Sequence, residues 1–278
     1  MHSSKHCNLI GQYSIFNAFK FFLSELRLNR HATFRMFERN YLNRYAGTFL
    51  GRFWLIVIPC VPLLVYNTLQ WMGIFGNQHN GMPRAISLTI GLTIYYTFSE
   101  LLQSTTSSIL TNRNFIINTG IPKMVILTTE LYSVITNFFI RFLVLLISFS
   151  LYPDFFSFKI FFLPLIIIPL VVLAFSIGIV NSLVSVLYKD VPNIINITTF
   201  YLLFASGVFG RVDTPGPFFD ILRASPIHII INNFRDYVFL STFNFNWFET
   251  ATIMFCFVLF PFTILLFYRG EKYVNSHF

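Results

Sequence analysis

The sequence predicts an all-α membrane protein with about six transmembrane helices, and its composition and hydropathy carry this prediction. Hydrophobic residues make up 55% of the 278 residues, charged residues only 11%, and the mean hydropathy is +0.66. Soluble domains have about 25% charged residues, and so few charges cannot cover this much apolar surface in water. The chain is therefore expected to fold in lipid, where a helix of about 20 apolar residues crosses the bilayer.

Six apolar runs are candidates for these helices. Ser, Thr and Tyr residues interrupt the second run, and the fifth run is short, so five or seven spans remain alternatives. The runs comprise residues 53–72, 85–103, 123–151, 160–188, 194–209 and 248–268. They predict a transmembrane domain over 53–268, followed by a short tail over 269–278.

Basic residues are concentrated before the first run, where eight Lys and Arg side chains occur. Because Lys and Arg collect in cytoplasmic segments, both termini are predicted to be cytoplasmic. Residues 1–52 are polar and lack the pattern of a cleavable signal peptide. The net charge of +8 is assigned to contact with anionic membrane lipids and not with nucleic acid, because no separate basic face with aromatic stacking positions is recognisable.

An amphipathic stretch occupies the second part of residues 1–52. Its apolar residues recur at helical spacing, which predicts a helix that lies flat at the membrane surface; a simple anchor is the alternative. Arg35 and Arg39 are one turn apart and are expected to project together. The apolar positions are Ile15, Phe16, Phe19, Phe22, Leu23 and Leu26.

A glycine–arginine turn joins this stretch to the first apolar run. Gly47 and Gly51 are four residues apart and are flanked by Arg44 and Arg52, and the run opens with Trp54. Glycine permits a sharp change of direction, and Trp favours the membrane interface. The two arginines are expected at a depth where they can meet a lipid phosphate.

Two further segments are neither spans nor plain loops. Residues 104–122 are polar with a small apolar stripe, which fits a short cytoplasmic helix that docks on a partner, or an ordinary connecting loop. Residues 210–247 contain several Pro and Gly residues amid apolar patches too short to span. Short half-inserted helices at the outer face are expected there, because irregular backbone at membrane depth must be buried or line a wet cavity.

Three charged residues fall inside the apolar runs, namely Glu100, Glu130 and Arg141. Ionisable residues within a membrane are functional candidates. Glu100 is near the end of its run, where contact with water is expected. Glu130 and Arg141 lie on one helix about 16 Å apart, so they cannot touch, and Arg141 either lines a pathway or makes a structural pair.

The order of these features resembles the membrane subunit of bacterial ABC transporters that export lipid-linked polysaccharide, such as O-antigen, group 2 capsule and teichoic acid. The resemblance covers residues 35–268 and depends on the order of loose motifs. These are the basic interface helix, the Arg-Tyr…Leu-Gly…Trp turn, the polar loop ending near Pro122, Tyr188-Lys-Asp190, Ser225-Pro226 and then Arg235.

Two departures weaken the assignment to a subfamily. Family members often have Asn-Pro where this chain has Ser225-Pro226, and Arg-Asp where it has Lys189-Asp190. Neither change removes the charge or the turn.

The resemblance implies that two copies of the chain surround a central channel, above two separate ATPase subunits that bind ATP and Mg. It implies no cofactor and no metal on this chain. It also implies four groups of site residues: a lipid gate (Arg44, Tyr45, Gly47, Leu50, Gly51, Arg52, Trp54), an ATPase-coupling segment (Ser107, Ile109, Leu110, Asn112, Arg113, Asn114), channel-lining side chains (Tyr66, Arg141, Tyr201, Phe204) and an outer gate (Pro215, Pro217, Pro226, Arg235).

These expectations define a transport subunit of the bacterial inner membrane and not an enzyme. No segment matches the phosphate-binding P-loop pattern, so ATP is expected on another subunit. The predicted substrate is an undecaprenyl-pyrophosphate-linked polysaccharide, with O-antigen the first choice. An exporter of drugs or small lipids is the alternative. A membrane transferase is disfavoured because His79, His228 and the scattered acids form no paired motif.

Overall fold

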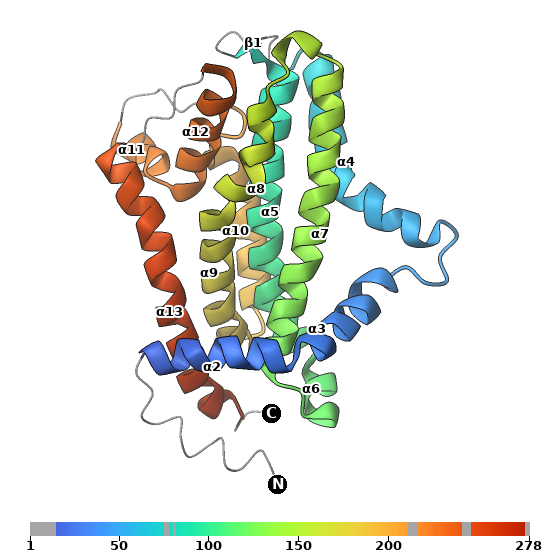
Figure 1. Cartoon of the computed structure of the whole chain (residues 1–278), viewed down its shortest axis with the longest axis vertical. Helices are drawn as coiled ribbons and strands as arrows, with labels where there is room; N and C mark the ends of the chain where they lie inside the picture. The colour runs from blue at the N-terminus through green and yellow to red at the C-terminus, as the bar shows by residue number, and fades with distance from the viewer. Residues whose placement is uncertain (1–14, 75–77, 80–81, 211–215, 241–245, 276–278) are drawn as a thin grey trace.

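The computed structural model describes residues 15–74, 78–79, 82–210, 216–240 and 246–275, and these form an upright bundle of helices (Figure 1). Within the described residues, five helical segments are long and apolar enough to cross a membrane, which confirms the all-α, polytopic fold class. They are Gly51–Trp71 with α4 (Trp54–Trp71), α5 (Arg84–Thr111), α7 (Lys123–Ser150), Phe158–Leu187 with α8 (Leu163–Ile166) and α9 (Ile168–Leu187), and Trp247–Glu271 within α13 (Trp247–Asn275).

Shorter elements connect these helices. The surface helices α2 (Ile15–Leu28) and α3 (Arg30–Phe37) lead into a π-helical turn, η2 (Glu38–Leu42). Between α4 and α5, the two-residue strands β1 (Gln78–His79) and β2 (Met82–Pro83) pair antiparallel. The remaining short elements are the 3-10 turns η3 (Gly51–Phe53), η4 (Pro153–Phe155) and η5 (Phe158–Phe162) and the helices α6 (Arg113–Thr119), α10 (Val191–Ala205), α11 (Pro217–Arg223) and α12 (Pro226–Leu240).

The fifth apolar run differs from the predicted span. Helix α10 has 15 residues, which is about 22 Å at the α-helical rise and shorter than the hydrocarbon core of about 30 Å. The predicted run continued to residue 209, but the helix ends at Ala205 and the chain turns at Gly207, whose φ is 78°. The described part of the chain therefore has five long spans and one shorter apolar helix where about six spans were expected.

Helix α5 also departs from expectation, because it is longer than the predicted run and lies at the centre of the bundle (Figure 1). Its hydroxyl groups donate to the carbonyl one turn earlier: Thr89 to Ala85 at 2.7 Å, Thr93 to Thr89 at 2.8 Å and Thr97 to Thr93 at 2.7 Å. Polar side chains that satisfy themselves in this way can be buried. The Ser and Thr residues that interrupt this apolar run are therefore compatible with the burial of α5 in the core.

Close contact between α5 and α9 depends on a glycine. A Cβ atom added to Gly178 of α9 would lie 2.7 Å from Cβ of Thr105 on α5. Two helical turns further along α9, the Ser185 hydroxyl donates to the Thr106 carbonyl at 3.0 Å. Small residues that let two backbones approach are the usual basis of helix packing in membranes.

The end of α10 is buried beneath the short helices α11 and α12, which fit the two predicted half-inserted helices. Arg235 of α12 is only 2% exposed, and its guanidinium donates to the carbonyls of Gly207 at 2.8 Å and Val208 at 2.6 Å. The same group also donates to the Ser87 carbonyl of α5 at 2.8 Å. These two carbonyls belong to the turn that follows α10, and because buried carbonyls need partners, Arg235 lets the chain turn inside the protein.

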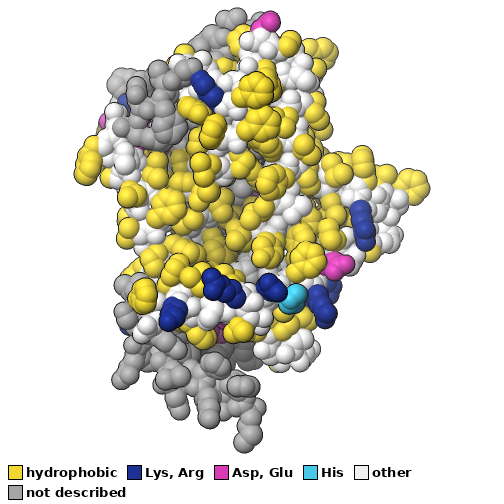
Figure 2. Space-filling model, in the orientation of Figure 1, with side chains coloured by type: hydrophobic (Ala, Val, Ile, Leu, Met, Phe, Trp, Pro, Cys, Tyr) yellow, Lys and Arg dark blue, Asp and Glu magenta, His cyan; other side chains and the backbone are white. Residues whose placement is uncertain are grey.

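The surface helix α2 runs across the lower end of the bundle, transverse to the spanning helices (Figure 1). Phe22 packs edge-on against Phe260 of α13 at 5.8 Å between ring centroids, and Phe21 packs against Tyr268 at 5.1 Å. The Tyr268 hydroxyl donates to the Glu25 carboxylate at 2.5 Å. Lys and Arg side chains gather over α2 and α3, below a flank covered by hydrophobic side chains (Figure 2).

The first prediction concerns Arg235. Replacing it by methionine keeps the length of the side chain but leaves buried carbonyls without donors, so Arg235→Met should lower the free energy of unfolding by about 3–5 kcal/mol. The control is Arg223→Met, because the Arg223 side chain is on the surface, 3.2 Å from Asp220, and its loss should cost within about 0.5 kcal/mol. Thermal unfolding of the purified protein measures both, and equal losses would contradict the capping role.

The second prediction concerns Glu25, whose pKa is raised above 4.5 chiefly by burial against α13. The folded protein then keeps a proton that the unfolded chain has lost, so this group's stabilising contribution is complete below the ordinary pKa and is lost as the pH rises through the raised pKa. The melting temperature of the native protein should fall relative to that of Glu25→Gln as the pH rises. Parallel pH profiles of the melting temperature for the native protein and Glu25→Gln would contradict this prediction. The control is Glu38→Gln, which alters an exposed carboxylate.

Candidate functional site

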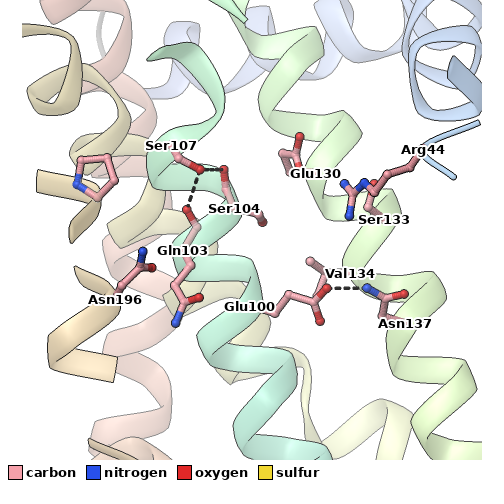
Figure 3. Close-up of a pocket in the computed structure, with 11 residues that line it drawn as sticks. Arg44, Glu100, Gln103, Ser104, Ser107, Glu130, Ser133, Val134, Asn137 and Asn196 are labelled. Carbon is pink, nitrogen blue, oxygen red and sulfur yellow. Dashed lines mark hydrogen bonds between the residues drawn. The ribbon is translucent and has the colours of Figure 1, made fainter. Parts of the chain in front are cut away.

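A polar cleft of about 330 Å³ lies between α5, α7 and α10 (Figure 3). Its lining contains two carboxylates, several hydroxyl and amide groups and one guanidinium. The lining residues are Arg44, Glu100, Gln103, Ser104, Ser107, Glu130, Ser133, Val134, Asn137, Pro192 and Asn196. In a bundle whose flank is hydrophobic, this cleft is the clearest place for a polar ligand.

Helical spacing brings these residues to one place. On α5 the lining positions are 100, 103, 104 and 107, and on α7 they are 130, 133, 134 and 137. Positions three, four and seven residues apart share one face of a helix. Glu100 and Glu130 are recognisable in the sequence as charged residues within apolar runs, whereas Gln103, Ser133 and Asn196 were not predicted as site residues. A search for polar residues at this spacing inside the apolar runs would have found the stripes on α5 and α7.

One wall of the cleft is a hydrogen-bonded network that contains Arg141. The Arg141 guanidinium forms an ion pair with the Glu100 carboxylate, which also accepts a hydrogen bond from the Asn137 amide. Arg141 is 4% exposed and does not line the cleft. Arg141 was expected either to line a pathway or to make a structural pair, and the structure shows the pair, with Glu100. The Glu100 side chain bonds to Arg141 and Asn137 but is still 30% exposed and lines the cleft, so its expected contact with water stays a prediction.

The network extends to the surface segment through Tyr41 of η2, whose hydroxyl donates to the Asn137 side-chain oxygen. Burial is the main cause that raises the pKa of Tyr41 to about 12, so the hydroxyl keeps the proton that it donates. The ring of Tyr41 stacks on Phe37 at 5.1 Å, and Phe37 packs edge-on against Tyr132 of α7 at 6.3 Å. The surface segment is thereby fixed to the helices that form the cleft.

The predicted lipid-gate segment, Arg44 to Trp54, follows directly and stands away from the bundle (Figure 1). Gly47 and Gly51 have φ values of 87° and 49°, a region that favours glycine, so the sharp turns expected there are present. Arg44 reaches the cleft (Figure 3), and Arg52 is exposed. The apolar side chains exposed on this segment are Phe49, Leu50 and Phe53, whereas Tyr45 and Trp54 are half-buried.

The residues predicted to couple to an ATPase are divided between two helices. Ser107, Ile109 and Leu110 belong to the last turns of α5, where Ile109 is fully buried and Ser107 lines the cleft. Arg113 and Asn114 begin the short helix α6, and Asn112 lies at the junction. The short helix expected within 104–122 is therefore confined to Arg113–Thr119, because α5 continues for two more turns than its apolar run suggested.

Helix α6 contacts the surface helices through a second groove, which His31, Arg35, Met36, Arg39, Phe115 and Ile121 line among others. The Arg39 guanidinium lies over the Phe115 ring, 3.9 Å from its centroid. Arg35 and Arg39 do project together, as their spacing predicted.

The predicted channel-lining aromatic residues lie on and beside the exposed face of α10. Tyr201 and Phe204 are 68% and 57% exposed. Phe204 stacks on Phe209 at 5.4 Å, and Phe209 contacts Tyr66 of α4 at 5.2 Å. The sequence analysis missed Phe209, which joins the two predicted positions Tyr66 and Phe204.

The predicted outer-gate residues that the structure describes begin or stabilise short elements at the upper end of the bundle. Pro217 and Pro226 are the first residues of α11 and α12, where proline suits the start of a helix. Arg235 is buried and caps the turn after α10, and Pro215 lies outside the described residues. No group of three or more His, Cys, Asp or Glu side chains in the described segments is placed to hold a metal ion.

The third prediction tests the pair of Glu100 and Arg141. Arg141→Met leaves a carboxylate without its guanidinium and should lower the free energy of unfolding by about 3–5 kcal/mol. The double variant with Glu100→Gln should recover about 1–3 kcal/mol of the summed single losses. The control is Arg141→Met with Glu249→Gln, since Glu249 bonds to Asn233 and shares no partner with Arg141. Additive losses in the first double variant would contradict the pair.

Comparison with known protein families gives one match, and a comparison with curated proteins finds none. Residues 31–239 match the ABC-2 type transporter family, a range that contains the cleft, the gate segment, α6 and α12. Members of this family are membrane components of ATP-driven transporters, which in general associate with ATPase subunits and dimerise. The chain is therefore a multi-pass membrane protein that belongs to the ABC-2 type transporter family.

Proposed function

We propose that this protein is the membrane subunit of an exporter that moves an undecaprenyl-pyrophosphate-linked polysaccharide, of the O-antigen class, across the bacterial inner membrane. One observation carries the proposal. The segment from Arg44 to Trp54 presents two arginine side chains together with the exposed apolar side chains of Phe49, Leu50 and Phe53. A substrate with a pyrophosphate head and a polyprenyl tail needs both kinds of contact at one site.

The other elements then have consistent roles. The basic surface helices α2 and α3 face the cytoplasmic leaflet, which is rich in anionic lipids, so both termini are cytoplasmic. Helix α6, at the same end of the bundle (Figure 1), contacts one of two ATPase subunits, on which ATP and Mg bind. Two copies of the chain form the channel, and the aromatic side chains Tyr66, Tyr201 and Phe204 line it because the C–H faces of sugar rings pack on aromatic faces.

The fourth prediction tests this function with the ATPase partner present. In proteoliposomes that contain both subunits, lipid-linked polysaccharide should stimulate ATP hydrolysis. Arg44→Gln with Arg52→Gln should weaken the half-maximal response about tenfold or more, since charge-assisted bonds to phosphate are lost. Arg27→Gln removes an exposed basic side chain of α2 instead and should leave the response unchanged.

Three outcomes would contradict the proposal. One is that no complex forms with an ATPase, and a second is that lipid-linked polysaccharide leaves its activity unchanged. The third is stimulation by apolar drugs or small lipids in place of the polysaccharide, which would favour the drug and lipid exporter.

A further inference from the structure

The lining of the polar cleft consists of a part whose bonds are already made and a part that is available to a ligand. Glu100 and Asn137 bond to Arg141, Tyr41 and each other. By contrast, the Glu130 carboxylate makes no hydrogen bond or ion pair with the described residues, and neither does the Asn196 side chain. Glu130 and Asn196 come from opposite sides of the cleft, with Gln103, Ser104 and Ser107 of α5 between them (Figure 3).

The available groups are a mixture of donors and acceptors. A carboxylate accepts hydrogen bonds, and an amide both donates and accepts. The Ser104 and Ser107 hydroxyls already donate to backbone carbonyls of α5, so toward a ligand they act as acceptors. Gln103 donates to the Thr199 hydroxyl at 2.5 Å, which leaves its amide oxygen in the cleft as an acceptor. Such a lining matches a ligand that carries many hydroxyl groups, because each hydroxyl also donates and accepts.

The charges of the cleft favour an uncharged ligand. Arg141 compensates Glu100, and the exposed Arg44 lies on the same side of the cleft as Glu130 (Figure 3). Only Val134 and Pro192 are apolar among the lining residues, whereas sites for drug-like molecules are lined mostly by apolar and aromatic side chains. The volume of about 330 Å³ falls within the range of small-molecule sites, which is about 300–1,000 Å³.

We propose that the cleft between α5, α7 and α10 binds an uncharged, hydroxyl-rich ring of the pyranose class. Glu130 accepts hydrogen bonds from the ring hydroxyls on one side, and Asn196 and Gln103 contact the ring on the other side. The inference rests on the proposed function, and it deepens that function by assigning the sugar, as distinct from the pyrophosphate and the lipid tail, to a specific site beside Arg44.

The fifth prediction uses a cysteine as a reporter of occupancy. In the full chain with Cys7, Cys60 and Cys256 replaced by alanine, Ser107→Cys places a thiol in the cleft. Methyl pyranosides of glucose, mannose, galactose and N-acetylglucosamine should slow its reaction with a small uncharged thiol reagent. The matched control is Thr111→Cys, one turn further along α5, where the side chain is exposed and outside the cleft; its rate should not change.

A second substitution connects the protection to Glu130. In the Ser107→Cys chain, Glu130→Gln should raise the pyranoside concentration needed for protection about tenfold, because one acceptor oxygen is replaced by an amide donor. Thr136→Val, on the same helix but outside the cleft, should leave that concentration unchanged. The protein is held in nanodiscs of phosphatidylcholine, whose headgroup has no hydroxyl, so that lipid headgroups do not supply the ligand.

If replacing the native cysteines or Ser107 prevents folding, saturation-transfer NMR of the native chain with the same methyl pyranosides replaces the labelling. The expected result is a transfer signal that Glu130→Gln reduces and Thr136→Val does not.

The inference is overturned by any of three results. These are equal protection of the two cysteines, protection that Glu130→Gln leaves intact, and protection by tetraphenylphosphonium in place of the pyranosides. Failure of the proposed function is distinct. If pyranosides protect Ser107→Cys but lipid-linked polysaccharide does not stimulate the ATPase, the pyranose site stands and the exporter assignment fails. If the polysaccharide stimulates the ATPase but pyranosides give no protection, the exporter assignment stands and the pyranose site fails.

Discussion

In a bundle surrounded by lipid, each buried polar group must find its partner inside the protein, because water is not there to supply one. Helix α5 meets this requirement within itself, since Thr89, Thr93 and Thr97 bond to its own carbonyls. The buried turn after α10 cannot meet it alone, and Arg235 donates to the carbonyls of Gly207 and Val208 there. The positions of α10, α11 and α12 around the central helix follow from these bonds.

The same requirement explains why the polar side chains of α5 and α7 separate into two sets. Glu100 and Arg141 compensate each other and, through Asn137, hold Tyr41 of η2. This network joins the surface segment to the spanning helices and thereby places Arg44 at the cleft. Groups without such partners, Glu130 above all, face the cavity, where a polar ligand can supply what the protein does not.

The surface elements form a continuous contact from α6 to the gate segment. Arg39 of η2 lies over Phe115 of α6, two residues before Tyr41, which bonds to the network that forms one wall of the cleft. A displacement of α6 would thus act on the same short segment that positions Arg44. Under the proposed function α6 contacts an ATPase, and this arrangement would connect that contact directly to the proposed ligand site.

The sequence by itself determined the class of the protein, the approximate limits of the long helices, the amphipathic surface stretch and the sharp turns at Gly47 and Gly51. Each depends on local composition, on spacing along one chain segment or on the freedom of a single residue type. Only the tertiary structure decided that Arg141 pairs with Glu100, that Arg235 bonds to the turn after α10, that Phe209 joins Tyr66 to Phe204, and that α5 belongs in the core. These facts depend on which helices are neighbours, and a buried polar group takes its role from the partner that packing brings to it.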